Sequence, residues 1–178
     1  FLSRMMRYYI RTDSLKDVLA YKEHFMSLPK TLKAQDLIEL SGYLLEKRYG
    51  ELKPSEEELR YKIEDVRNLL ERALKADPQN AIALYNMGHY FIETENNSSA
   101  KKMLQLAIDS FREQTTRSKR DTYKYINSFR MLGERYAESR EYILAEETYV
   151  NGIQLFEAKN RESNFESTPQ IGELYSNL

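Results

Sequence analysis

The strongest constraint on the fold is a helical pattern of apolar residues that stops at Asp77-Pro78 and soon starts again. Pro78 has no backbone N–H and disfavours helical dihedral angles at Asp77, so a helix must end there. On both sides, apolar residues recur at steps of three and four, the spacing that places them on one face of an α-helix. The stripe before the break contains Leu59, Ile63, Val66, Leu70 and Ala73, and the one after it contains Leu84, Met87, Gly88 and Phe91.

A third stripe follows the polar stretch 95–99, and it contains Ala100, Leu104, Ala107, Ile108 and Phe111. Short polar breaks between amphipathic helices are typical of helices that fold back on one another. The sequence therefore predicts antiparallel helical hairpins and no sheet, with a break at 77–80 and a turn at 95–98. We also expect Gly88 and Gly133 to lie where paired helices approach closely.

Composition excludes several classes of function. The 27 Lys and Arg residues nearly balance the 28 Asp and Glu residues, so no bulk charge favours nucleic acid or an anionic membrane. No apolar run approaches the roughly 18 residues that a membrane span needs, so membrane insertion is not expected. With no cysteine, the chain has neither disulfides nor thiolate metal sites.

The stripes recur along the chain. Leu70 and Ala73 return 34 residues later as Leu104 and Ala107. A second set returns 45 residues later, so that Leu84, Gly88, Phe91, Ala100 and Ala107 become Phe129, Gly133, Tyr136, Ala145 and Gly152. The difference of 11 residues is about three helical turns, which keeps the stripes in phase. An internal repeat of this length indicates an array of stacked hairpins.

The repeated residues resemble the tetratricopeptide repeat (TPR) family. Its pattern is met over 81–114 by Leu84, Met87-Gly88, Phe91, Ala100, Leu104 and Ala107, without the closing proline. It is met again over 126–159 by Phe129, Leu132-Gly133, Tyr136, Tyr142, Ala145, Tyr149 and Gly152. The resemblance is close over about 66–159 and loose elsewhere.

This resemblance implies an all-α fold of about nine helices, stacked as a TPR-like right-handed α-solenoid. The expected hairpins cover about 1–29, 31–77, 80–115 and 119–159, and a terminal helix covers 168–177. Residues Ile171, Leu174 and Tyr175 of that helix are expected to pack against 142–157. The chain opens with Phe1 rather than Met, so we interpret 1–178 as one solenoid segment of a longer protein.

The sequence offers no catalytic, cofactor or metal site. His24 and His89 lack the spacing of metal-binding histidines, and no phosphate-binding loop or nucleophile elbow is present. Neighbouring acidic residues such as Glu146-Glu147 point apart on a helix, which is typical of a solvated face. The basic run Arg117, Lys119, Arg120 and Lys124 is interpreted as a solvated turn between helices.

In TPR arrays the first helix of each hairpin lines a concave groove that binds a protein segment. The resemblance therefore implies a partner-binding surface formed by the outward positions of two first helices. These positions are Ile82, Tyr85, Asn86, His89, Ile92 and Glu93 in one repeat, and Asn127, Arg130, Met131, Glu134 and Glu138 in the next. We expect Tyr85 and Tyr90 to be exposed, and we assign neither Tyr85 nor Arg130 to the core. A clamp for a terminal carboxylate is disfavoured, because Glu134 occupies one of its positions.

The predicted function is that of a non-catalytic scaffold for protein–protein interaction within a larger assembly. Two alternatives stay open. The chain could associate with itself through its end helices, or it could be a regulatory repeat array attached to an enzyme outside this segment. Neither the partner nor the cellular compartment follows from the residues.

Overall fold

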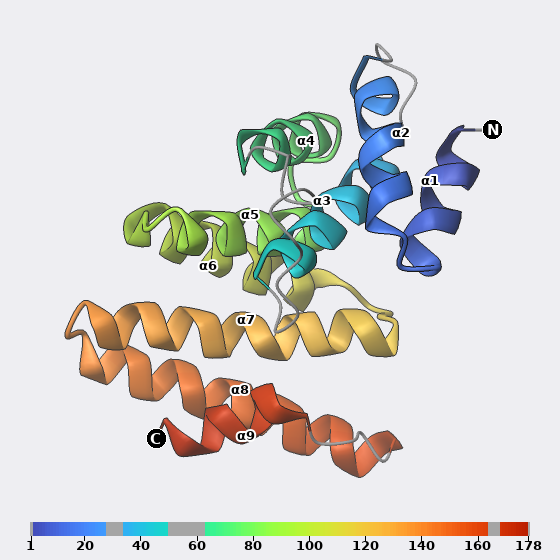
Figure 1. Ribbon diagram of the computed structural model, residues 1–178. Coiled ribbons are helices and arrows are strands. Elements are labelled where there is room, and N and C mark those ends of the chain that lie inside the picture. The colour runs from blue at the N-terminus through green and yellow to red at the C-terminus, as the bar shows by residue number, and fades with distance from the viewer. Residues whose placement is uncertain (1, 28–33, 50–62, 164–167, 178) are drawn as a thin grey trace. The chain divides into compact units, whose positions relative to one another are not determined.

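The fold is built from helices alone in the part of the chain that the computed structural model describes, namely residues 2–27, 34–49, 63–163 and 168–177. This confirms the predicted all-α class (Figure 1). The nine helices of these ranges are α1 (Leu2–Arg11), α2 (Leu15–Ser27), α3 (Ala34–Tyr49), α4 (Ile63–Ala76), α5 (Ala81–Glu93), α6 (Asn97–Glu113), α7 (Lys119–Glu138), α8 (Tyr142–Ser163) and α9 (Pro169–Ser176). None of the helices in these ranges combines the length and apolar character that a membrane span requires.

The chain divides into two compact units, with the boundary between Pro78 and Gln79. The first unit contains α1 to α4 and the second contains α5 to α9. A single solenoid over 1–178 stays a prediction. Leu59, which belongs to the predicted stripe before α4, lies outside the described residues.

Two ion pairs connect the hairpins of the first unit. The Lys22 ammonium of α2 lies 2.6 Å from the Asp65 carboxylate of α4, and the Arg7 guanidinium of α1 lies 3.3 Å from Asp36 of α3. Lys22 and Asp36 are both buried. Removing one member of a buried ion pair is costly, so these contacts favour the pairing of α2 with α4 and of α1 with α3.

The predicted break at 77–80 is present, and the turn predicted at 95–98 is present but ends earlier, because Asn97 and Ser98 already belong to α6; each break ends in an asparagine cap. Helix α4 ends at Ala76, and the side chain of Asn80 accepts a hydrogen bond of 3.1 Å from the N–H of Ala83 at the start of α5. The second break covers only 94–96, because Asn96 caps α6 and the helix begins at Asn97. Such a cap satisfies an N–H group that the helix itself leaves unpaired.

Three hairpins share one turn geometry. Asp13, Glu95 and Arg140 each have a positive φ, between 56° and 63°. In each turn this residue donates its N–H to a carbonyl three residues back, and the next residue donates to a carbonyl five residues back. This is the Schellman motif, which closes a helix and reverses the chain. The geometry at Glu95 recurs 45 residues later at Arg140, in step with the apolar repeat.

Glycines allow the helices of two hairpins to approach closely. A Cβ atom added to Gly88 would lie 2.8 Å from Leu104 Cγ of α6. One added to Gly133 would lie 2.6 Å from Tyr149 Cδ1 of α8. In both hairpins the contacted residue follows the glycine by 16 positions. The predicted close contacts at Gly88 and Gly133 are confirmed.

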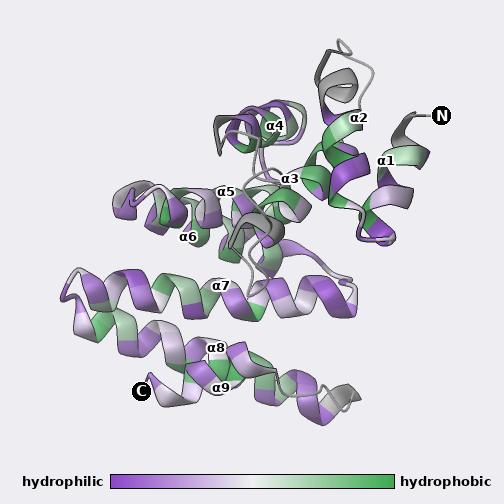
Figure 2. Ribbon diagram, viewed as in Figure 1, coloured by the Kyte–Doolittle hydropathy of each residue, from purple (hydrophilic) through white to green (hydrophobic). Residues whose placement is uncertain are grey.

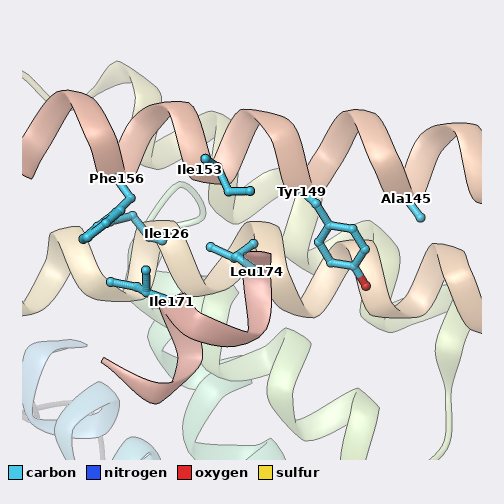
Figure 3. Packing of buried hydrophobic residues seen from close by; sticks show 7 residues of the cluster. All are labelled: Ile126, Ala145, Tyr149, Ile153, Phe156, Ile171 and Leu174. Carbon is cyan, nitrogen blue, oxygen red and sulfur yellow. The ribbon is translucent and has the colours of Figure 1, made fainter. Parts of the chain in front are cut away.

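Helix α9 packs against both α7 and α8. Its Ile171 and Leu174 are buried in a cluster with Ile126 of α7 and with Tyr149, Ile153 and Phe156 of α8 (Figure 3). Tyr175 also faces α8, as predicted, but only at the rim of this contact: its hydroxyl donates a 3.2 Å hydrogen bond to Glu157 Oε1, and the side chain is 47% exposed. Helix α7 carries hydrophobic and hydrophilic residues in alternating patches along its length, as expected for a helix with one packed side (Figure 2).

A matched pair of glycine substitutions tests this packing. Gly133→Ala places a Cβ against the buried ring of Tyr149, whereas Gly172→Ala in α9 places one where no atom lies within 4 Å. Replacing a helical glycine by alanine stabilises the folded state of both variants by about 1 kcal/mol, because alanine has the higher helix propensity. The overpacking cost, on the order of 1–3 kcal/mol, applies only to Gly133→Ala. We expect chemical denaturation to rank Gly172→Ala as more stable by that difference, and equal stability would contradict the close contact.

Candidate partner-binding surface

The predicted groove residues lie on α5 and α7, but they differ in burial. Seven of them are half-buried and accessible in part: Ile82, His89, Ile92, Glu93, Asn127, Arg130 and Glu134. Glu138 is exposed. Tyr85, Asn86 and Met131 are buried, with exposed fractions of 8%, 2% and 4%. These three residues therefore support the surface from below rather than form its outer layer.

The prediction that Tyr85 and Tyr90 are exposed is wrong. Tyr85 turns its ring toward the next hairpin, where the side-chain amide of Asn127 donates a 2.8 Å hydrogen bond to its hydroxyl. The ammonium of Lys124 lies 4.7 Å from the centre of the same ring. Tyr90 is 6% exposed and stacks edge-on against Phe91. The apolar stripe marks only the side of each helix that packs within its own hairpin, so it carries no signal for contacts between hairpins.

A polar network continues from Tyr85 across the first helices of the second unit. Asn127 accepts a 2.8 Å hydrogen bond from Arg130 Nε through its side-chain oxygen. The guanidinium of Arg130 pairs with Glu134 at 2.5 Å and with Glu173 of α9 at 3.1 Å. Arg130 is half-buried and outside the core, as expected, and its side chain connects α7 to α9. Arg130 already faces two carboxylates, which also argues against a clamp for a ligand carboxylate at this position.

The remaining charged groups of α5 pair locally. His89 Nε2 lies 3.3 Å from Glu93 Oε1, one helical turn away, and both side chains are about three-quarters buried. This pair attracts electrostatically only when the imidazole is protonated. The side chain of His24 lies outside the described residues.

A small cavity opens beside this network, between α5, α7 and α9. Its volume is about 160 Å³. Tyr85 and Tyr123 supply aromatic walls, and Lys124, Thr168 and Gln170 supply polar groups. These last three residues were not predicted from the sequence as site residues. Lys124 was grouped with the basic run, and Thr168 and Gln170 come close to it only because α9 packs on α7.

The basic run does not act as one surface. The guanidinium of Arg117 donates hydrogen bonds to the carbonyl oxygens of Phe111 and Arg112, and it lies 4.9 Å from the centre of the Tyr125 ring. It thus closes the C-terminal end of α6. Lys124 instead faces the cavity. The interpretation of this run as a solvated turn is therefore wrong for Arg117 and Lys124, although Lys119 and Arg120 are exposed.

Within the described ranges, no group of three or more His, Cys, Asp or Glu side chains is arranged to hold a metal ion. The packing of Tyr149 shifts its pKa: burial raises the pKa of the hydroxyl above the usual range, and the Glu134 carboxylate raises it further.

No family model matches the chain, and the comparison with curated proteins also found no match.

The hydrogen bond between Tyr85 and Asn127 is testable by removing one oxygen. Tyr85→Phe removes this partner from the half-buried amide group of Asn127, so we expect a loss of about 0.5–1.5 kcal/mol in the free energy of unfolding. The matched control is Tyr142→Phe, because the Tyr142 side chain is 66% exposed in the same unit. Urea denaturation should show a loss in the first variant and no change in the second. Equal stability of both variants would mean that the hydroxyl of Tyr85 contributes nothing.

Proposed function

We propose that the chain is a non-catalytic scaffold that binds a segment of a partner protein along the faces of α5, α7 and α9 within a larger multi-protein assembly. The observation that carries this proposal is the network from Tyr85 through Asn127 and Arg130 to Glu173, which joins these three helices side by side. Helices α6 and α8 pack behind α5 and α7 as their hairpin partners. The first helices of successive hairpins thus form one continuous surface.

The proposed architecture is a TPR-like right-handed α-solenoid. Three features support it: the same Schellman turn in three hairpins, the 16-residue interval from glycine to its packed neighbour in two of them, and the 45-residue recurrence of both. Stacked hairpins with a constant rotation form a curved array whose first helices line the inner side. A groove of this kind is suited to an extended or helical segment.

The chemistry of the proposed surface suits a protein ligand. Ile82 and Ile92 contribute apolar area, His89 and Asn127 contribute polar groups, and the charges of Arg130 and Glu134 compensate each other. Mixed surfaces of this type are common in protein interfaces, whereas polyanion-binding surfaces carry one sign of charge. Tyr85, Asn86 and Met131 hold this surface in place.

Substitutions on the two sides of the hairpins test this proposal. The double variant Ile82→Ala with His89→Ala changes half-buried positions of α5, and the matched control Leu106→Ala with Leu144→Ala changes side chains of α6 and α8 that are 41% and 42% exposed. Proteins that bind the parent chain are captured from an extract and identified by mass spectrometry. The melting curves of both variants are first compared with that of the parent chain. Each captured protein is then titrated against the parent chain and both variants. We expect the α5 variant to weaken binding about tenfold or more, equivalent to roughly 1.4 kcal/mol, and the control to bind normally. The opposite result would assign binding to the second helices.

Self-association is a second candidate function, and one observation favours it. Tyr142, Ile143 and Leu144 are consecutive at the start of α8 and are 66%, 75% and 42% exposed. Adjacent exposed apolar side chains of this size commonly mark contact surfaces. If copies associate here, Ile143→Glu should shift the molar mass measured by light scattering from dimer to monomer at micromolar concentration. A monomeric parent chain over the same concentrations would exclude this candidate.

A further inference from the structure

The first turns of α8 are exposed, whereas the equivalent turns of α6 are covered. Positions 45 residues apart are equivalent in the two hairpins, so Tyr142 and Glu146 of α8 correspond to Asn97 and Lys101 of α6. Asn97 and Lys101 contact the C-terminal end of α7 and the turn after it, where the Lys101 ammonium lies 2.5 Å from the Glu141 carboxylate. In contrast, Tyr142 is 66% exposed, and Glu146 is exposed as well.

Helix α9 covers α8 in part. The buried residues Ile126 and Phe129 of α7 recur 45 residues later as Ile171 and Leu174 of α9, which are also buried. Helix α9 therefore lies on α8 as α7 lies on α6, but it ends at Ser176 and lies away from the first turns of α8 (Figure 3). The start of α8 is thus a surface of the kind that a further helical segment covers in α6.

Four exposed side chains at the start of α8 form what we call the acidic end surface: Tyr142, Ile143, Glu146 and Glu147. They fall within about 140° of the helix circumference, so one neighbouring helix can contact all four. That helix must supply apolar area for Tyr142 and Ile143, and positive charge for the two carboxylates. Two copies of the acidic end surface would repel each other, because like charges would meet.

Helix α1 has an exposed side of the required chemistry. Arg4, Tyr8 and Arg11 are exposed, and their spacing of four and three residues places them on one side of the helix. Met6, on the opposite side, is buried within the first unit. We call Arg4, Tyr8 and Arg11 the basic α1 face. Its guanidinium groups can pair with carboxylates and stack on aromatic rings, and the Tyr8 ring adds apolar area.

We propose that copies of this chain associate through the basic α1 face of one copy and the acidic end surface of another. In this contact Glu146 and Glu147 pair with Arg4 and Arg11, while Tyr8 packs on the apolar residues of the acidic end surface. Helix α1 thereby covers the start of α8 as the end of α7 covers the start of α6. The inference rests on self-association, the second candidate function, and it assigns two different surfaces to the contact.

Light scattering on two charge variants tests this contact. Arg4→Gln with Arg11→Gln neutralises the basic α1 face, and Glu146→Lys with Glu147→Lys reverses the charge of the acidic end surface. The matched control Glu113→Lys changes an exposed carboxylate of α6 outside both surfaces. Circular dichroism melting curves establish that each variant keeps the parent fold. We expect the parent chain and the control to associate at micromolar concentration, and each charge variant alone to be monomeric.

A mixture of the two charge variants then identifies the surfaces that meet. Each variant keeps one surface intact, so one native contact can form between unlike molecules, and we expect a complex of one copy of each. Added salt should weaken this complex, because exposed charges are screened. A monomeric parent chain would overturn self-association and this contact together. If the parent chain associates but the mixture stays monomeric, self-association stands through other surfaces and the proposed contact is overturned.

Discussion

The close approach of paired helices at glycine is the constraint on which the second unit depends. Leu104 and Tyr149 occupy the space that a side chain at Gly88 or Gly133 would need. The ring of Tyr149 also reaches the cluster that anchors α9 through Leu174. A larger residue at Gly133 would therefore displace α8 from α7 and disturb the support of α9 at the same time. Glycine destabilises a helix by about 1 kcal/mol relative to alanine, and the close packing of the paired helices offsets this cost.

The candidate site arises from contacts between hairpins, whereas the core of each hairpin arises from contacts within it. Tyr85 and Asn127 are 42 residues apart in sequence, and Arg130 of α7 pairs with Glu173 of α9, 43 residues farther along the chain. The polar network is therefore a consequence of stacking. It holds α5, α7 and α9 in one register.

Periodicity explains which parts of this structure were predictable. The helix breaks at Pro78 and Asn96, the contacts of Gly88 and Gly133, and the burial of Ile171 and Leu174 all follow from spacing within one hairpin or one helix. The burial of Tyr85, Asn86 and Met131 did not follow, because a helix in a stack is covered on two sides and its second covered side has no separate periodic signal. The cavity was missed for the same reason, since it needs residues of α5, α7 and α9 together.

The shared Schellman turn also determines where this chain can change its length. Each turn fixes the residues around Asp13, Glu95 and Arg140 by two backbone hydrogen bonds, so an inserted residue there would break the reversal between two packed helices. The link from α6 to α7 is different, because residues 114–116 are exposed and lie between a closed helix end and the Ser118 cap. Loop closure costs rise slowly with length, so growth at such a junction is tolerated thermodynamically. An insertion scan should therefore find permissive positions between hairpins and intolerant ones within them, which makes the hairpin the unit by which such a chain gains or loses length.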